Sequence, residues 1–344
     1  MDYSRGEIIA LLQSEGAQKE ELFRQAVAAR NEAVGDGIYL RGLIEYSNIC
    51  RKNCHYCGIR SASKCGRYTL SYKQVLEAAE YAWKKSFGSV VLQGGENMSP
   101  KYVAEITYLI KEIKSLSGGE LGITLSLGEQ TPETYAEWFA AGAHRYLLRI
   151  EASNRRLYEK IHPNDDAHDF QRRLQALYDL REAGYQVGTG VMIGLPFQTV
   201  EDLAGDLMFM RDFDIDMCGM GPYIVSEGTP LAEFAGLLQS EEWRLEMTLK
   251  MIAVLRLMMP DINIAATTAL QAIEPGGRLR AIDAGANVIM PNLTPDELKG
   301  NYLLYHNKPM SLDTRIMERN VRYGVKGDPA HFATRKQGDG GKPK

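Results

Sequence analysis

Short apolar runs alternate with longer amphipathic segments along most of the chain. Residues 18–34 are the first amphipathic segment, and the apolar runs predict eight strands, at residues 43–46, 89–93, 123–127, 145–150, 186–193, 217–224, 262–267 and 287–290. Several of the predicted helices between them open on serine or threonine followed by proline, a favoured helix start. Because strands alternating with helices are typical of parallel sheets, we predict an α/β fold with a single (β/α)8 TIM-type barrel. An open doubly wound sheet is the alternative.

The two ends of the chain lie outside this alternation. Residues 18–34 predict an entry helix, which Gly35-Asp36-Gly37 ends. Residues 311–323 predict a last helix, and residues 335–344 are polar and glycine-rich, which is typical of a frayed tail. We therefore predict three parts: an N-terminal helical extension at 1–38, a barrel at 39–310, and a C-terminal helix with a flexible tail at 311–344.

The composition is that of a globular chain, and its charge limits the partners. A net charge of −4 provides no basic footprint, so we expect neither nucleic acid nor an anionic membrane as a partner. No run of apolar residues is long enough to span a bilayer, and the first 25 residues alternate charged and apolar positions, unlike a signal peptide. Five cysteines, an odd number, fit a reducing compartment better than a disulfide framework, so we expect a cytoplasmic protein.

Three of the five cysteines, Cys50, Cys54 and Cys57, stand close together directly after the first predicted strand. A zinc site normally takes four protein ligands, and no second cysteine or Cys-His pair follows at zinc-ligand spacing. Three thiolates at this spacing can each bind a different iron of one [4Fe-4S] cube and leave the fourth iron open. An open iron suits chelation of S-adenosylmethionine (SAM) and its one-electron cleavage to a 5′-deoxyadenosyl radical.

This C-x3-C-x2-C loop, with Tyr56 before its last cysteine, resembles the signature of the radical SAM family. The resemblance implies that the three cysteines are the catalytic cluster ligands and that SAM is the second cofactor. Gly94-Gly95-Glu96 after the second strand resembles the family's GGE motif, although it would otherwise be read as a plain turn. The cofactor contacts that we predict are Tyr56, Gly94, Gly95, Glu96, Glu151, Arg173 and Met192.

Arg149 and Glu151 alternate with apolar residues on the fourth strand, so both charges face the barrel interior or its mouth. Burial of two charges is costly unless they are paired or hold a ligand. Two interpretations therefore stay open. The residues form a structural ion pair, or Glu151 binds the cofactor while Arg149 binds an anionic substrate. The role of Arg173 as a clamp on the SAM carboxylate rests on the family resemblance alone.

Within the radical SAM family, the chain resembles the HydE family of [FeFe]-hydrogenase maturases. The segments that carry the resemblance include RGLIEYSNICRKNCHYCGIR (41–60), TLSLGE (124–129), RYLLRIEASN (145–154), GYQVGTGVMIGLPFQT (184–199), NIAATTA (263–269) and GANVIMPNLTP (285–295). The resemblance implies a cysteine-bound Fe(CO)2(CN) precursor as substrate, H-cluster assembly as the purpose, transient contact with other maturases and an external one-electron reductant. It implies a substrate cavity lined by Thr124, Arg149, Met217, Thr267, Thr268, Tyr302 and Tyr305.

Other activities stay open as alternatives. A methylornithine synthase, an amino-acid mutase of the PylB type, also works without a second cluster. A biotin synthase would need further cysteines inside the barrel, and Cys218 alone argues against it. An electron-transfer protein would need four protein ligands for its cluster. Several HydE members carry three more cysteines near the C-terminus, but none follows Cys218 here, so we expect no second cluster.

Overall fold

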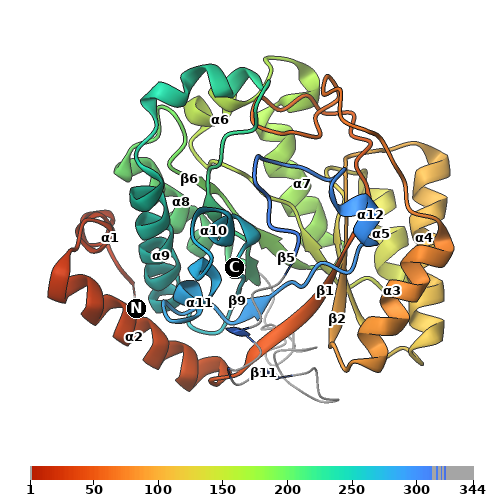
Figure 1. Cartoon of the computed structure of the whole chain (residues 1–344), viewed down its shortest axis with the longest axis horizontal. Helices are drawn as coiled ribbons and strands as arrows, with labels where there is room; N and C mark the ends of the chain where they lie inside the picture. The colour runs from red at the N-terminus through yellow and green to blue at the C-terminus, as the bar shows by residue number, and fades with distance from the viewer. Residues whose placement is uncertain (1, 312–314, 317–318, 320, 323–344) are drawn as a thin grey trace.

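The computed structural model describes residues 2–311, 315–316, 319 and 321–322, and it is built around a barrel of parallel strands ringed by helices (Figure 1). The strands are β1 (Ile38–Ser47), β2 (Ser89–Gly94), β3 (Gly122–Ser126), β4 (Arg145–Leu147), β5 (Gln186–Thr189), β7 (Met217–Cys218), β9 (Asn263–Ile264) and β10 (Val288–Ile289). They are hydrogen-bonded in the order β10-β1-β2-β3-β4-β5-β7-β9. A bridge between Ala265 and Val288 joins the two ends, so the predicted barrel is confirmed and the open sheet is not.

The outer helices begin where capping residues stand in the sequence. They are α3 (Tyr72–Lys84), α4 (Pro100–Leu116), α5 (Pro132–Ala141), α7 (Phe170–Glu182), α8 (Val200–Phe213) and α9 (Glu241–Met258). Ser71 accepts a hydrogen bond from the backbone of Gln74 in a reciprocal capping box, and Ser99 and Thr131 cap the helices that follow them. Because each crossover is helical and covers the outer face, both faces of the strands are buried.

The predicted strands at 186–193 and 217–224 are each broken in two. After β5 and β7 the chain opens a gap and then pairs again as β6 (Met192–Ile193) and β8 (Gly221–Pro222). At the break, a Cβ atom on Gly190 would lie 2.2 Å from the carbonyl oxygen of Gly219, so only glycine fits there. At the interruption the Gly219 and Val191 carbonyls accept hydrogen bonds from Arg149, which follows the end of β4.

The N-terminal extension contains two helices, α1 (Arg5–Leu12) and α2 (Gly16–Val34), which contact α8 and α9. The helix α1 was not predicted from the sequence, although a capping box between Ser4 and Glu7 marks its start. Short helical segments not predicted as such are α6 (Arg155–Ile161), η1 (Asp166–His168), η2 (Pro230–Leu237) and α10 (Thr268–Ile273). The short helix predicted near residue 278 is α11 (Gly277–Ile282), and the capped helix start that residues 294–297 predict is that of α12 (Asp296–Lys299). Among the described helices, none combines the length and apolar character needed to cross a membrane.

The predicted last helix at residues 311–323 falls largely outside the described residues, and the predicted tail at 335–344 falls wholly outside them. Within the first range, Val321–Arg322 form β11, which pairs in parallel with β1. The helix prediction is therefore wrong at these two positions, because pairing with a strand edge decided the backbone there rather than local helical pattern.

Candidate active site

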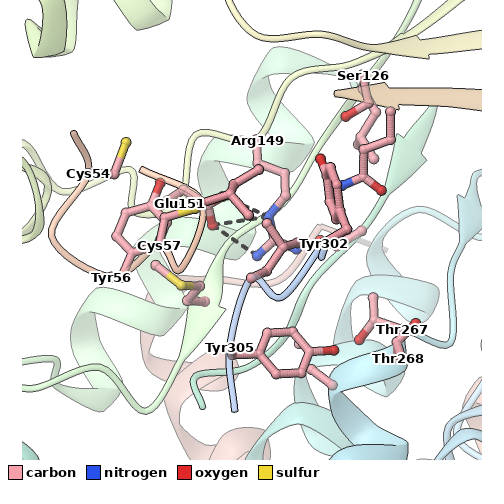
Figure 2. Close-up of a pocket in the computed structure, with 18 of the residues that line it drawn as sticks. Cys54, Tyr56, Cys57, Ser126, Arg149, Glu151, Thr267, Thr268, Tyr302 and Tyr305 are labelled. Carbon is pink, nitrogen blue, oxygen red and sulfur yellow. Dashed lines mark hydrogen bonds and ion pairs between the residues drawn. The ribbon is translucent and has the colours of Figure 1, made fainter. Parts of the chain in front are cut away.

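A cavity of about 330 Å³ lies where the barrel strands end. Figure 2 shows the cysteine loop on one side, with Tyr302, Tyr305 and two threonines on the other and Arg149 and Glu151 between them. Chemistry in such barrels sits at this face, because the loops that follow the strands meet there. Most of the predicted site residues line this one cavity: Cys50, Cys54, Tyr56, Cys57, Gly94, Gly95, Glu96, Arg149, Glu151, Arg173, Met192, Thr267, Thr268, Tyr302 and Tyr305.

The cysteine loop follows β1 and is bonded to the end of β2. The backbone N–H of Glu96 donates to Cys50 Sγ at 3.3 Å, and the backbone N–H of Arg51 donates to the Glu96 carbonyl at 2.9 Å. A Cβ atom on Gly95 would lie 2.4 Å from the Ile49 carbonyl oxygen. Gly94-Gly95-Glu96 is therefore more than a plain turn, since it holds the first cysteine in place and requires glycine to do so.

Gly95→Ala is expected to push the cysteine loop away from β2. We expect a loss of roughly 1–3 kcal/mol in the free energy of unfolding, the usual cost of overpacking, together with a clear drop in iron bound after reconstitution. Thermal unfolding and iron analysis measure the two effects. The matched control is Gly205→Ala on α8, where a Cβ atom meets nothing within 4 Å. Iron content equal in the two variants would contradict this account of the motif.

The three thiols have a donor chemistry that fits a cationic cluster. Burial raises the pKa of all three, to about 12 for Cys54, so that without a cation they are protonated. Bound metal cations reverse this preference, since they stabilise the thiolate directly. Among the described residues, no three His, Cys, Asp or Glu side chains are gathered as ligands of a single ion. Three thiols on one loop and in one cavity could instead hold a cluster with one thiolate on each of three irons.

A buried network of charges surrounds the cysteine loop. Glu129 accepts hydrogen bonds from Lys52 Nζ at 2.9 Å and from Arg173 Nε at 2.6 Å. Glu96 Oε2 accepts from the backbone N–H of Glu129, whereas Glu96 Oε1 accepts no hydrogen bond but forms ion pairs with Arg51 Nε at 3.2 Å and Lys52 Nζ at 3.6 Å. Burial raises the pKa of Glu96, while at Glu129 the effect of burial is outweighed by Arg173 and Lys52, which lower the pKa.

Arg173 lies on α7, whose first turn is capped by Asp169. Its Nη1 donates to the Arg149 carbonyl at 2.6 Å, and its Nη2 has no hydrogen-bond partner among the described residues. Arg172 also approaches Glu129, with its Nε 3.5 Å from Oε2, but its side chain is 45% exposed against 8% for that of Arg173. The two neighbouring arginines are therefore distinguished by the structure, and Arg173 is the one that lines the cavity.

Arg149 and Glu151 form an ion pair inside the cavity. Arg149 Nε lies 2.9 and 3.0 Å from the two carboxylate oxygens of Glu151, and Arg149 also donates to the carbonyls of Gly219 and Val191 (Figure 2). Burial lowers the pKa of Arg149, but the contact with Glu151 outweighs it and the pKa is raised. Glu151 adopts a φ of 65°, which non-glycine residues rarely do. The structural ion pair is thus formed, and both of its members still line the cavity.

The sequence is similar to known radical SAM proteins. Residues 44–210 match the model of the Radical SAM superfamily. The "[FeFe] hydrogenase maturase subunit HydE" of Thermotoga maritima is 44% identical over 84% of this chain and 80% of its own length. The chain belongs to the HydE family of radical SAM proteins. Its radical SAM segment contains the cysteine loop and all predicted cofactor contacts.

The HydE-family chain is also similar to methylornithine synthases, in sequence and in structure. The "3-methylornithine synthase" of Methanosarcina acetivorans is 28% identical over 85% of this chain and 80% of its own length. The crystal structure of methylornithine synthase (PylB) superposes with a TM-score of 0.78 at 25% identity, covering 94% of this chain and 95% of that one. The barrel fold is therefore common to HydE and methylornithine synthase and does not distinguish them. Only residues at the substrate end of the cavity can distinguish them.

Two residues predicted to bind the HydE substrate, Thr124 and Met217, do not line the cavity. Thr124 is fully buried and pairs across β3 and β4 with Arg145. Met217 begins β7, and its sulfur accepts a hydrogen bond from Arg41. Both lie below the mouth of the barrel, because their side chains come before the strand ends. Their role as substrate contacts therefore stays a prediction. On β3 the cavity residue is Ser126, which faces the same way as Thr124 two residues further along the strand.

Other cavity residues were not singled out from the sequence at all. Glu45 and Lys308 both line the cavity and form an ion pair, and Lys52 lines it beside the cysteines. Glu45 alternates with apolar residues on β1, and Lys52 stands inside the cysteine motif, so both carried a weak signal. Lys308 carried none, since it lies in a loop and its partner is far away in sequence.

Proposed function

We propose that this chain is a maturase that binds a [4Fe-4S] cluster through Cys50, Cys54 and Cys57 and cleaves SAM there. Its substrate would be a cysteine-bound Fe(CO)2(CN) precursor of the hydrogenase active site, the H-cluster. The observation that carries the proposal is that the three thiols and a wall of hydroxyl-bearing side chains share one cavity. Identity of 44% to the HydE subunit favours this activity over the mutase, for which the identity is 28%.

The cofactor end of the cavity offers donors and acceptors suited to SAM. When bound, the cluster would supply the electron that breaks the sulfonium bond. Arg173 Nη2, which has no hydrogen-bond partner among the described residues, is placed to bind the SAM carboxylate. Glu96 Oε1 accepts no hydrogen bond and suits the amino group, with the backbone of Gly94 and Gly95 close by. Further contacts with SAM would come from Tyr56, Glu151 and Met192.

The substrate end offers hydroxyls and one arginine. Thr267 Oγ1 donates to the Met220 carbonyl, and Thr268 Oγ1 accepts from Arg278 at 2.7 Å, so both hydroxyls are oriented. Tyr302 and Tyr305 complete this wall (Figure 2). A guanidinium has five N–H donors. In Arg149 the Nε–H and one Nη2–H face Glu151, while one Nη1–H and the other Nη2–H bond two carbonyls, which leaves one Nη1–H for an anionic iron complex. This arrangement supports recognition of a substrate that carries a carboxylate or cyanide.

Arg149→Ala tests the proposed function. We expect conversion of the iron–cysteine complex to fall by about 100-fold or more, because a buried charge-assisted contact is lost. Arg149→Lys is the matched control, and it should recover only part of the activity since it lacks the planar fork. An Arg149→Ala variant that converts the complex normally would contradict the proposed substrate site.

The partners would follow from this chemistry. SAM cleavage requires an external one-electron reductant, and the iron complex would arrive through transient contact with another maturase. The chain would work in the cytoplasm, where thiols stay reduced. The described cysteines are consistent with this, since all five are free.

A further inference from the structure

Residues 301–308, here called the strap, follow α12 and contribute four side chains to the cavity wall: Tyr302, Leu304, Tyr305 and Lys308. In Figure 1 the blue segment after α12 runs back across the barrel. The strap contains no helix or strand, so its position depends on individual contacts. These contacts connect it to two places, the cysteine loop and the end of β1.

The first connection joins the strap to the cysteine loop. The backbone N–H of Gly58, the residue after Cys57, donates to the Leu304 carbonyl at 2.9 Å. A Cβ atom on Gly58 would lie 2.1 Å from the carbonyl oxygen of the preceding residue, Leu303, so the two backbones touch. Asn48 Nδ2 donates to the Asn301 carbonyl at 2.7 Å, before the first cysteine. The strap therefore contacts the loop on both sides of the three cysteines.

The second connection is the ion pair between Lys308 and Glu45. The side chains are 5% and 1% exposed, and the Lys308 ammonium also donates to the Tyr302 carbonyl at 2.8 Å. Its Nζ lies 5.0 Å from the centre of the Tyr302 ring. Glu45 is held in turn by Asn292, whose Nδ2 donates to Oε2 at 3.0 Å. Two charges buried this deeply persist only when each satisfies the other, so the loss of either one should release the strap.

We propose that Lys308 is a positioning residue: its ion pair with Glu45 holds the strap over the cavity, which sets Tyr302 and Tyr305 toward the substrate and Leu304 against the cysteine loop. The pair thereby links the substrate end of the cavity to the cluster end. Burial lowers the pKa of Lys308 and raises that of Glu45, and each partner offsets the other, as expected of a pair whose charges depend on contact.

Amide hydrogen exchange on the reconstituted holoenzyme tests this role, because the Gly58 and His306 amides report closure directly. Gly58 donates to Leu304, and His306 donates to the Val225 carbonyl at 3.2 Å. In Lys308→Met we expect both amides to exchange about tenfold faster or more. If that variant does not fold, Lys308→Gln is measured against the same threshold. Lys308→Arg should stay within about threefold of the parent enzyme.

The charge swap gives the decisive comparison. Glu45→Lys alone should open the strap, and Glu45→Lys combined with Lys308→Glu should close it again. The control is Lys84→Met, which removes a lysine that pairs with Glu80 on α3 and should leave both amides unchanged. Exchange in Lys308→Met within about threefold of the parent, or a swap as open as the single variants, would overturn the proposal. The purpose of this positioning rests on the proposed function. Exchange is measured without substrate, however, so the test of Lys308 can fail while the proposed function stands, and the reverse.

Discussion

Replacement of any one of Cys50, Cys54 and Cys57 by serine is expected to reduce SAM cleavage to background. Each thiolate would hold a different iron, so a hydroxyl at one position leaves the cluster incomplete. The measurements are 5′-deoxyadenosine formed under reducing conditions and iron bound after anaerobic reconstitution, which should be about four per parent chain.

The remaining cysteines supply the controls for this experiment. Cys65→Ser and Cys218→Ala should retain SAM cleavage, because neither thiol lines the cavity. Cys218 is fully buried and lies 3.7 Å from the Met210 sulfur, which is why alanine is the better replacement there. Sensitivity at Cys65 equal to that at Cys57, or about eight irons per chain, would show that the ligand set is wrong.

Arg173→Ala is expected to weaken SAM binding by about 1.5–3 kcal/mol, the range of hydrogen bonds to charged groups. The matched variant is Arg172→Ala, which removes the neighbouring guanidinium. It lies 3.5 Å from Glu129 but is largely solvated, so its loss should cost less than about 0.5 kcal/mol. Isothermal titration of SAM into the holoenzyme compares the two, with thermal unfolding as a check on folding. A larger effect at Arg172 would move the carboxylate clamp to that residue.

The barrel could be predicted, and the residues predicted to bind the cofactor were found to line one cavity, because the signals for both are local. Apolar runs mark the strands, capping residues mark the helix starts, and the cysteine spacing lies within a single loop. The sequence does not show how far along a strand a side chain lies relative to the cavity. Thr124 and Ser126 face the same way, and only the point where β3 ends shows that Ser126 reaches the cavity. The same holds for Met217, which is predicted to line the substrate cavity but begins β7 and is not among the residues that line it.

Contacts between distant residues could not be predicted. Lys52 and Glu129 stand 77 positions apart, and Glu45 and Lys308 stand 263 positions apart. Nothing in the sequence near Lys308 indicates burial, since its ammonium is accommodated only because Glu45 faces it from β1. The small ladder β6–β8 is another case. It exists because glycine lets two strands approach at a break that a continuous apolar run does not reveal.

We propose that this HydE-family chain acts on sulfur of an iron–cysteine complex rather than on the carbon skeleton of an amino acid. The direct test is incubation with SAM, reductant and either the iron–cysteine complex or deuterated lysine, followed by mass spectrometry of all products. We predict an adenosylated sulfur species from the complex, its loss in Arg149→Ala, and no reaction with lysine. Conversion of lysine to methylornithine, with deuterium recovered in SAM, would contradict the account.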